Sequence, residues 1–243
     1  MVGGRGLPVE IPVQPDAITA AWLTDTLRAT GAITQARVTS LATQGLGNAK
    51  GLTGQVARLR LAYDTDEPDA QRSLIVKFSA PDPWTRDMVH DMGFYEREVR
   101  FYEQRAARSP LRTPRCYVSA LDPASGLALP LLEDLAPARN GSWIAGCSVA
   151  EAELTVRAIA ALHAAWWRHP QLADMSWLQL RRAISVRQAP VFFAQTWEPF
   201  LAKLGAHVTN EILQIGAWLE RHLGWLGAYL YEDAACTLIH NDY

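Results

Sequence analysis

The sequence predicts an α+β protein with a strand-rich first half and a helix-rich second half. Short apolar or alternating segments in the first half predict five strands, over residues 38–41, 55–63, 74–78, 115–118 and 127–132. Beyond residue 135, apolar residues recur at helical spacing, over residues 148–167, 177–204 and 209–231. We therefore predict two lobes that divide between residues 134 and 135.

The predicted organisation has three parts. Residues 1–15, with several Gly and Pro, are predicted to be a flexible leader. Residues 16–134 form the predicted N-lobe, with helices over residues 17–30 and about 87–105 beside its strands. Residues 135–243 form the predicted helical C-lobe, where Ser148 and Glu151 have the spacing of a capping box.

Composition excludes several classes of protein. A net charge of −2 and a pI of about 6.3 give no electrostatic reason to expect a nucleic-acid partner. The N-terminus lacks the apolar segment of a signal peptide, and charged residues interrupt every run that approaches the roughly 20 apolar residues needed to span a membrane. Three widely separated Cys predict buried, reduced thiols. We expect a cytoplasmic protein with neither nucleic acid nor membrane as a partner.

Lys77 is the first candidate functional residue. It is one of three Lys in the chain and stands inside the apolar segment Leu74–Phe78. A cation in such a strand needs either a partner or an exposed edge where its amine reaches water. The strand pattern alone leaves both interpretations open.

The helix predicted after this strand offers a partner for Lys77. At about 100° per residue, its apolar side chains form one arc, made by Phe94, Tyr95, Val99, Phe101 and Tyr102. Glu98 is the one charged residue near the middle of that arc. An inward carboxylate without a partner costs on the order of 3–5 kcal/mol, so we predict a buried ion pair between Glu98 and Lys77.

Two further segments have weaker signals. The glycine-dense stretch from Gly45 to Gly54 predicts a hairpin connection, and its position before the Lys77 strand makes backbone amides near Gly51 and Gly54 candidate phosphate donors. A flexible hairpin without a ligand is the alternative. Glu133 and Asp134 follow the last predicted strand, where they form either a connection that faces a nucleotide or a solvated turn.

The chain ends with Leu238-Ile239-His240-Asn241-Asp242-Tyr243. The apolar pair predicts the end of a strand, and His-x-Asp after a strand is how the catalytic loop of kinase-like phosphotransferases begins. Asp242 is then the candidate general base for a substrate hydroxyl, and His240 is expected to brace the loop.

In this order, the segments resemble the aminoglycoside phosphotransferase and choline-kinase-like superfamily, and most closely its ecdysteroid-kinase-like branch. The resemblance covers about residues 40–243 and rests on residues 74–78, 94–102, 114–117, 131–135, 161–166 and 238–243. It implies a protein-kinase-like fold of two lobes, with an antiparallel-sheet N-lobe and a helical C-lobe. It also implies ATP and Mg²⁺, and transfer of a phosphoryl group to a hydroxyl of an unidentified small molecule.

The resemblance also assigns roles to residues. Lys77 would contact the α- and β-phosphates, Glu98 would hold Lys77, and the backbone near Glu133 and Leu135 would meet adenine. Asp242 would be the catalytic aspartate. The resemblance places an Asn and then an Asp, both metal ligands, after the His-x-Asp motif.

The printed sequence stops before both metal ligands, so we expect a C-lobe truncated at the catalytic loop and little or no kinase activity from this polypeptide alone. Two alternatives follow. The chain is either a non-catalytic nucleotide-binding or interaction module, or the remnant of a broken gene.

Overall fold

A computed structural model describes residues 11–46, 53–138, 141, 144–178, 180–231 and 235–240. The chain divides into two compact units, Met1–Ala161 and Leu162–Tyr243. All described strands belong to the first unit, and the last of them ends at Glu133. The predicted lobe boundary at residues 134 and 135 follows that strand directly and stays a prediction.

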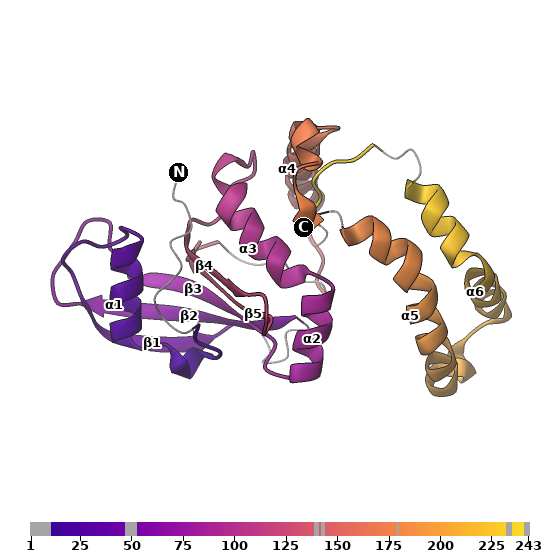
Figure 1. Ribbon diagram of the computed structural model, residues 1–243, viewed down its shortest axis with the longest axis horizontal. Helices are drawn as coiled ribbons and strands as arrows, with labels where there is room; N and C mark the ends of the chain where they lie inside the picture. Colours follow the sequence, from indigo (N-terminus) through magenta and orange to yellow (C-terminus); the bar gives the residue numbers. More distant parts are fainter. Residues whose placement is uncertain are drawn as a thin grey trace. The chain divides into compact units, whose positions relative to one another are not determined.

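The first unit is built on a five-stranded antiparallel sheet (Figure 1). Its strands are β1 (Val38–Gly45), β2 (Gly54–Tyr63), β3 (Ser73–Ser79), β4 (Cys116–Asp122) and β5 (Leu127–Glu133). They lie in the order β1-β2-β3-β5-β4, so β3 is the central strand. The five predicted strands are confirmed, although β1 runs four residues further than its apolar pattern indicates. Most of the glycine-dense connection between β1 and β2 lies outside the described residues.

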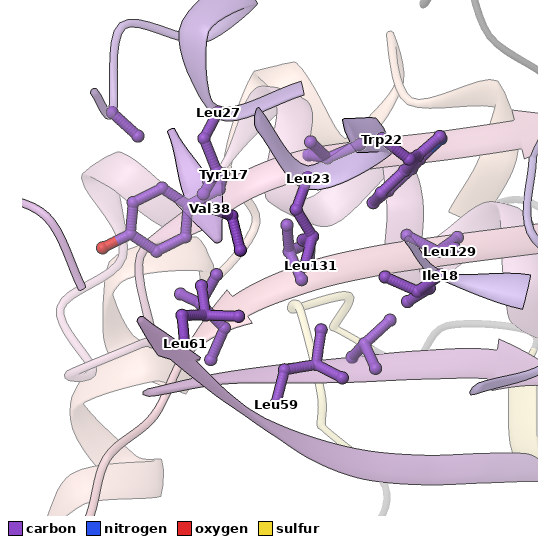
Figure 2. Packing of buried hydrophobic residues seen from close by; sticks show 14 of the residues in the cluster. Ile18, Trp22, Leu23, Leu27, Val38, Leu59, Leu61, Tyr117, Leu129 and Leu131 are labelled. Atoms are coloured by element: carbon purple, nitrogen blue, oxygen red, sulfur yellow. The ribbon is translucent and has the colours of Figure 1, made fainter. Parts of the chain in front are cut away.

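Helix α1 (Ala20–Ala29) covers one face of the sheet. The Thr19 side chain caps it by accepting a hydrogen bond from the Trp22 N–H. Side chains from α1 interdigitate with alternate residues of the strands in one buried cluster (Figure 2). Its most buried members include Leu23, Leu27, Leu59, Leu74, Val76, Leu129 and Leu131. This cluster is the main hydrophobic core.

The other face of the sheet packs against α2 (Pro83–Asp91) and α3 (Phe94–Gln104), where Val89, Tyr95, Val99 and Ala128 form a smaller cluster. The prediction of one helix over residues 87–105 is wrong. Asp82 caps α2 through the Thr85 N–H, and Gly93 adopts a left-handed conformation (φ 69°) between the two helices. A glycine in this conformation commonly ends a helix.

Five short 3₁₀ helices complete the regular structure of the described residues. They are η1 (Pro15–Ala17), η2 (Ala106–Arg108), η3 (Pro170–Leu172), η4 (Ser176–Leu178) and η5 (Gly205–His207).

The predicted capping box at α4 (Val149–Trp166) is confirmed, because Ser148 Oγ accepts from the Glu151 N–H and Glu151 Oε2 accepts from the Ser148 N–H.

Most of the second unit is a helical hairpin of α5 (Leu180–Leu204) and α6 (Asn210–Tyr231). The Trp197 ring rests against α6 at Gly216, where a Cβ would collide with it. Trp197 also stacks with Phe193 and Phe200 along α5. No helix in the described part of the chain has the length and apolar character that crossing a membrane requires.

Residues 235–240 have no regular secondary structure, so the predicted strand ending at Leu238-Ile239 is wrong. The segment bonds to the C-terminal end of α4 instead of to a neighbouring strand. The Arg168 N–H donates to the Cys236 carbonyl (2.8 Å), and Thr237 Oγ1 donates to the His163 carbonyl (2.7 Å).

Candidate functional site

The predicted pair between Lys77 and Glu98 is confirmed. Lys77 Nζ lies 2.5 Å from Glu98 Oε1, and joins the central strand β3 to helix α3. The sequence predicts a buried pair, which is wrong in degree, because the two side chains are 38% and 31% exposed. Ion pairs with this access to water stabilise folds by about 1 kcal/mol or less. The ion pair therefore directs the ammonium toward α3 only weakly, and the ammonium stays accessible to a ligand.

The helical wheel also misplaces one residue of α3. Tyr95 and Val99 are buried on the same side as Glu98, as predicted, but Phe94 is exposed at the first position of the helix. The break at Gly93 places Phe94 at the helix end, where Arg97 lies over its ring at 4.8 Å. Glu98 keeps its inward direction because Tyr95 and Val99 fix that face of α3.

Apolar side chains accompany the ammonium on its face of the sheet. Val56 of β2 is the direct cross-strand partner of Lys77, and Ile75 lies two residues before Lys77 on β3. Both positions point to the same face as Lys77, and both are half-buried. Sequence reasoning missed Val56 because only the strand register reveals it, whereas the alternation of side chains along β3 was enough to indicate Ile75. Together with Lys77 they form a surface that places apolar side chains beside a cation.

The glycine positions differ in what the structure says of them. Gly51 lies outside the described residues. Gly54 is the first residue of β2, and a Cβ there would collide with the carbonyl oxygen of Phe78. Gly54 thus allows β2 and β3 to approach closely two residues from Val56.

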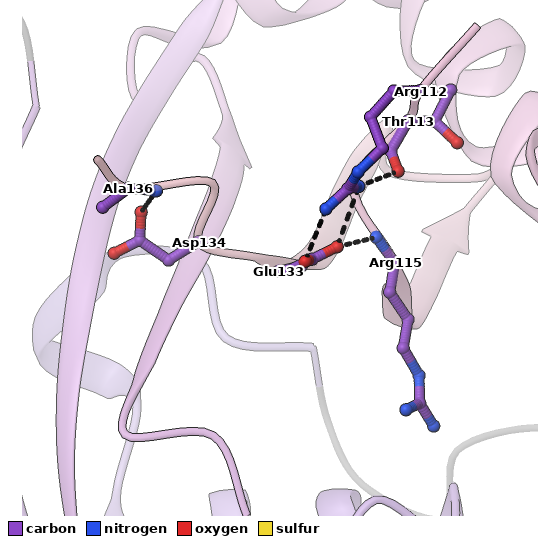
Figure 3. A network of polar contacts seen from close by, with 6 residues as sticks. All are labelled: Arg112, Thr113, Arg115, Glu133, Asp134 and Ala136. Atoms are coloured by element: carbon purple, nitrogen blue, oxygen red, sulfur yellow. Dashed lines mark hydrogen bonds and ion pairs between the residues drawn. The ribbon is translucent and has the colours of Figure 1, made fainter. Parts of the chain in front are cut away.

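The Glu133 carboxylate is hydrogen-bonded to neighbouring residues of the first unit (Figure 3). Its carboxylate accepts from Arg112 Nη1 and Nη2 at 3.2 and 2.8 Å, and from the Arg115 N–H at 2.9 Å. These bonds, that of Arg112 first, hold the pKa of Glu133 below its ordinary value. The Glu133 N–H donates to the Arg115 carbonyl at 2.8 Å. The side chain of Glu133 therefore ties the end of β5 to the segment that precedes β4.

The Asp134 side chain is not solvated, because it is 7% exposed and is hydrogen-bonded within the first unit. Contact between the connection after β5 and a nucleotide stays a prediction. Arg58 donates two hydrogen bonds to its carboxylate (2.7 and 3.2 Å), and the Ser73 hydroxyl donates a third (2.5 Å). Burial raises the pKa of Asp134, but the bonds from Ser73 and Arg58 outweigh it and leave the pKa below its ordinary value. Sequence reasoning missed this network because Arg58 and Asp134 are 76 residues apart.

Leu135 follows this network and its side chain is partly exposed. Its carbonyl accepts from the Ala138 N–H at 2.9 Å, while the Asp134 carboxylate accepts from the Ala136 N–H at 3.1 Å. The bonds from the Ala136 and Ala138 amides thus form a turn after Asp134.

A cavity of about 450 Å³ lies between the end of α3 and the start of β4. Tyr102, Leu111, Arg115, Cys116 and Glu133 are among its lining residues, and Lys77 is not. Burial raises the pKa of the Cys116 thiol to about 12, so this thiol is protonated at neutral pH and is no nucleophile. We therefore locate the candidate site at Lys77 and not in this cavity.

The other cysteines and the C-terminal candidates lie elsewhere. Cys147 and Cys236 are reduced but exposed, so the prediction of buried thiols is wrong for both. His240 is exposed. Asp242 lies outside the described residues. Among the residues that the structure describes, no three His, Cys, Asp or Glu side chains gather as a metal site.

The antiparallel sheet, the helices on both its faces and the Lys–Glu pair are consistent with a kinase-like fold of two lobes. The sequence model of the ecdysteroid kinase-like family matches residues 49–211, which is more than half of the chain. The chain belongs to this family, within the choline kinase-like superfamily. Comparisons with curated proteins and with solved structures gave no match.

Proposed function

We propose that the protein is an ATP-dependent phosphotransferase that acts on a hydroxyl group of a small organic molecule. Membership of the ecdysteroid kinase-like family supports kinase-like phosphotransferase activity in general. The observation that carries the nucleotide assignment is the half-exposed Lys77, which pairs with Glu98 and lies beside half-buried apolar side chains. The proposal includes a cytoplasmic location, where ATP is available.

Each part of that surface matches a part of ATP. The Lys77 ammonium contacts the α- and β-phosphates, and Glu98 keeps it directed toward them. Val56 and Ile75 provide apolar contact for the adenine ring, whose polar edge meets the backbone near Glu133 and Leu135. The amide groups at Gly54, and at Gly51 outside the described residues, approach the phosphates.

The transfer step requires a base for the acceptor hydroxyl. Asp242 takes that role in the proposal, with His240 bracing the loop, as the resemblance implies. Magnesium bound with ATP supplies neutralisation of the phosphate charge. In this proposal, the helices that follow residue 135 form the acceptor site. The fold does not identify the acceptor.

The test is ATP binding by the full chain with Lys77→Met. Loss of a charge-assisted contact is worth about 1.5–3 kcal/mol, so we expect a 10- to 100-fold weaker Kd for ATP by calorimetry. Lys203→Met, which removes an exposed lysine from α5, is the matched control and should bind ATP as the unaltered chain does. Equal Kd values for Lys77→Met and the unaltered chain would contradict the proposal.

A second measurement separates an enzyme from a nucleotide-binding module. Phosphoryl transfer from ATP is followed across a panel of hydroxylated compounds with and without Mg²⁺. Turnover that depends on Asp242 supports the phosphotransferase. ATP binding that depends on Lys77 but persists in EDTA, with transfer to no acceptor, supports the non-catalytic module.

A further inference from the structure

The Tyr95 hydroxyl joins three elements at the Lys77 end of the sheet. Tyr95 lies on α3 one turn before Glu98, and it is 6% exposed. Its oxygen accepts a hydrogen bond from the Ala80 N–H (2.8 Å), and its proton is donated to the Thr53 carbonyl (2.9 Å). Ala80 directly follows β3, and Thr53 directly precedes Gly54 at the start of β2.

These two bonds lie at one end of the paired strands that carry the candidate site. Val56 faces Lys77 across the β2–β3 pair, and Gly54 faces Ser79 two residues further along. Thr53 and Ala80 are the next residues beyond Gly54 and Ser79. The hydroxyl therefore ties the helix that carries Glu98 to the backbone at which the glycine-dense segment enters the sheet.

The strength of the available restraints favours Tyr95 over the ion pair as the element that fixes this geometry. An ion pair with both side chains about one third exposed is a weak restraint, since water competes for both charges. Buried hydrogen bonds to backbone groups are directional and lack that competition. The Tyr95 hydroxyl acts as donor in one of these backbone hydrogen bonds and as acceptor in the other.

We propose that Tyr95 is a positioning residue for phosphate binding, which holds the start of β2 and the carboxylate of Glu98 in register with Lys77. The inference rests on the proposed function, because it assumes that nucleotide phosphates bind beside Lys77. It predicts that Tyr95 affects ligands with phosphates and leaves the binding of the nucleoside part unchanged.

The experiment compares the affinities of the full chain for ATP and for adenosine. Tyr95→Phe removes both hydrogen bonds and keeps the ring. We expect ATP to bind about 5- to 10-fold more weakly, in line with the net loss of one or two neutral hydrogen bonds, and adenosine to bind within about 2-fold of the unaltered chain. Tyr63→Phe makes the same chemical change at the last residue of β2, where the Tyr63 hydroxyl donates to the Gln71 carbonyl (2.8 Å), and should leave the ratio of the two affinities unchanged.

The outcomes separate this inference from the proposed function. If the unaltered chain binds no ATP, both are overturned. If it binds ATP and Tyr95→Phe keeps the ratio of ATP to adenosine affinity, or weakens both ligands equally, only the role of Tyr95 in phosphate binding is overturned. Should Tyr95→Phe fail to fold, hydrogen exchange of the unaltered chain decides. ATP, but not adenosine, should slow exchange of the Ala80 amide, and equal exchange with both ligands would refute the inference.

Discussion

The two units of the chain differ in how they bury apolar side chains. In the first unit, α1 and the strands share one continuous cluster, and α2 and α3 cover the opposite face of the sheet. In the second unit, the buried apolar side chains among the described residues belong to α4, the turns after it and the C-terminal segment; they are Leu162, Trp166, Met175, Trp177 and Leu238. Helices α5 and α6 instead expose many apolar side chains, including Phe192, Ile215, Trp218, Trp225, Tyr229 and Leu230.

Geometry explains this difference. A sheet has two broad faces, and the first unit covers both with helices of its own. A helical hairpin buries the stripe along which its two helices meet and leaves much of its other apolar surface accessible. The first unit thus has a buried cluster on each face of its sheet, whereas the described part of the second unit contains little core. Stability should follow the same division.

The largest expected effect tests the core of the first unit. Leu129, in the centre of β5, is fully buried in the main cluster. Leu129→Ala should lower the free energy of unfolding by about 2–5 kcal/mol, because it removes buried methyl groups and leaves a cavity. Urea denaturation followed by circular dichroism measures this.

Leu230→Ala on α6 makes the same change at an exposed position and should alter stability by about 0.5 kcal/mol or less. Similar losses for the two variants would mean that α6 is covered as well as β5 is, and the contrast between the units would disappear.

A smaller effect is expected at the ion pairs of the first unit. The Asp134 side chain is 7% exposed and accepts from Arg58 and Ser73. Asp134→Asn removes the charge that faces Arg58 and should cost about 2 kcal/mol. Asp66→Asn is the matched control, because Asp66 also pairs with an arginine, Arg72 at 2.7 Å, but is 87% exposed. It should cost about 0.5 kcal/mol or less. An equal cost at both positions would show that burial does not set the strength of these pairs.

The smallest effect concerns pH. Glu67 accepts from the Thr34 hydroxyl and from the amides of Thr34, Gln35 and Ala36, and these bonds, that of the Thr34 hydroxyl first, lower its pKa from 4.5 to about 2. A depressed carboxyl pKa in the folded state stabilises the fold above pH 4.5, and this contribution is lost as the pH falls from 4.5 toward 2.

Glu67→Gln should therefore unfold at lower urea than the unaltered chain near pH 6, and the difference should shrink on acidification toward about pH 2.5. Urea midpoints at several pH values measure it. A difference between the two chains that stays constant over that range would contradict the assigned role of the Glu67 carboxylate.

Local pattern was enough to predict the five strands of the sheet and the pairing of Lys77 with Glu98, but it wrongly predicted a strand at Leu238-Ile239. A charge in the middle of an apolar helix face and a lysine inside an apolar strand both require explanation, and they explain each other. The same pattern could not show the break at Gly93, because a single glycine inside a helical stretch is compatible with a continuous helix.

Contacts that depend on register were beyond sequence reasoning. Arg58 and Asp134 meet only because β2, β3 and β5 are neighbours, and Val56 is visible beside Lys77 only once the strands are paired. Tyr95 was predicted as an apolar core residue, which is correct for its ring. Nothing in the helical pattern indicates where a hydroxyl at the edge of that core finds its partners.

Gly54 is a position that serves both the packing of the sheet and the proposed binding of phosphate. The Phe78 carbonyl leaves no room for a side chain at Gly54, so every non-glycine allele would force β2 away from β3. Purifying selection would then retain this glycine for the sake of the sheet, even in a descendant that had abandoned nucleotides. A retained Gly54 in a related protein would therefore indicate only that the sheet is retained. Replacement of Lys77 would indicate that the phosphate contact is lost.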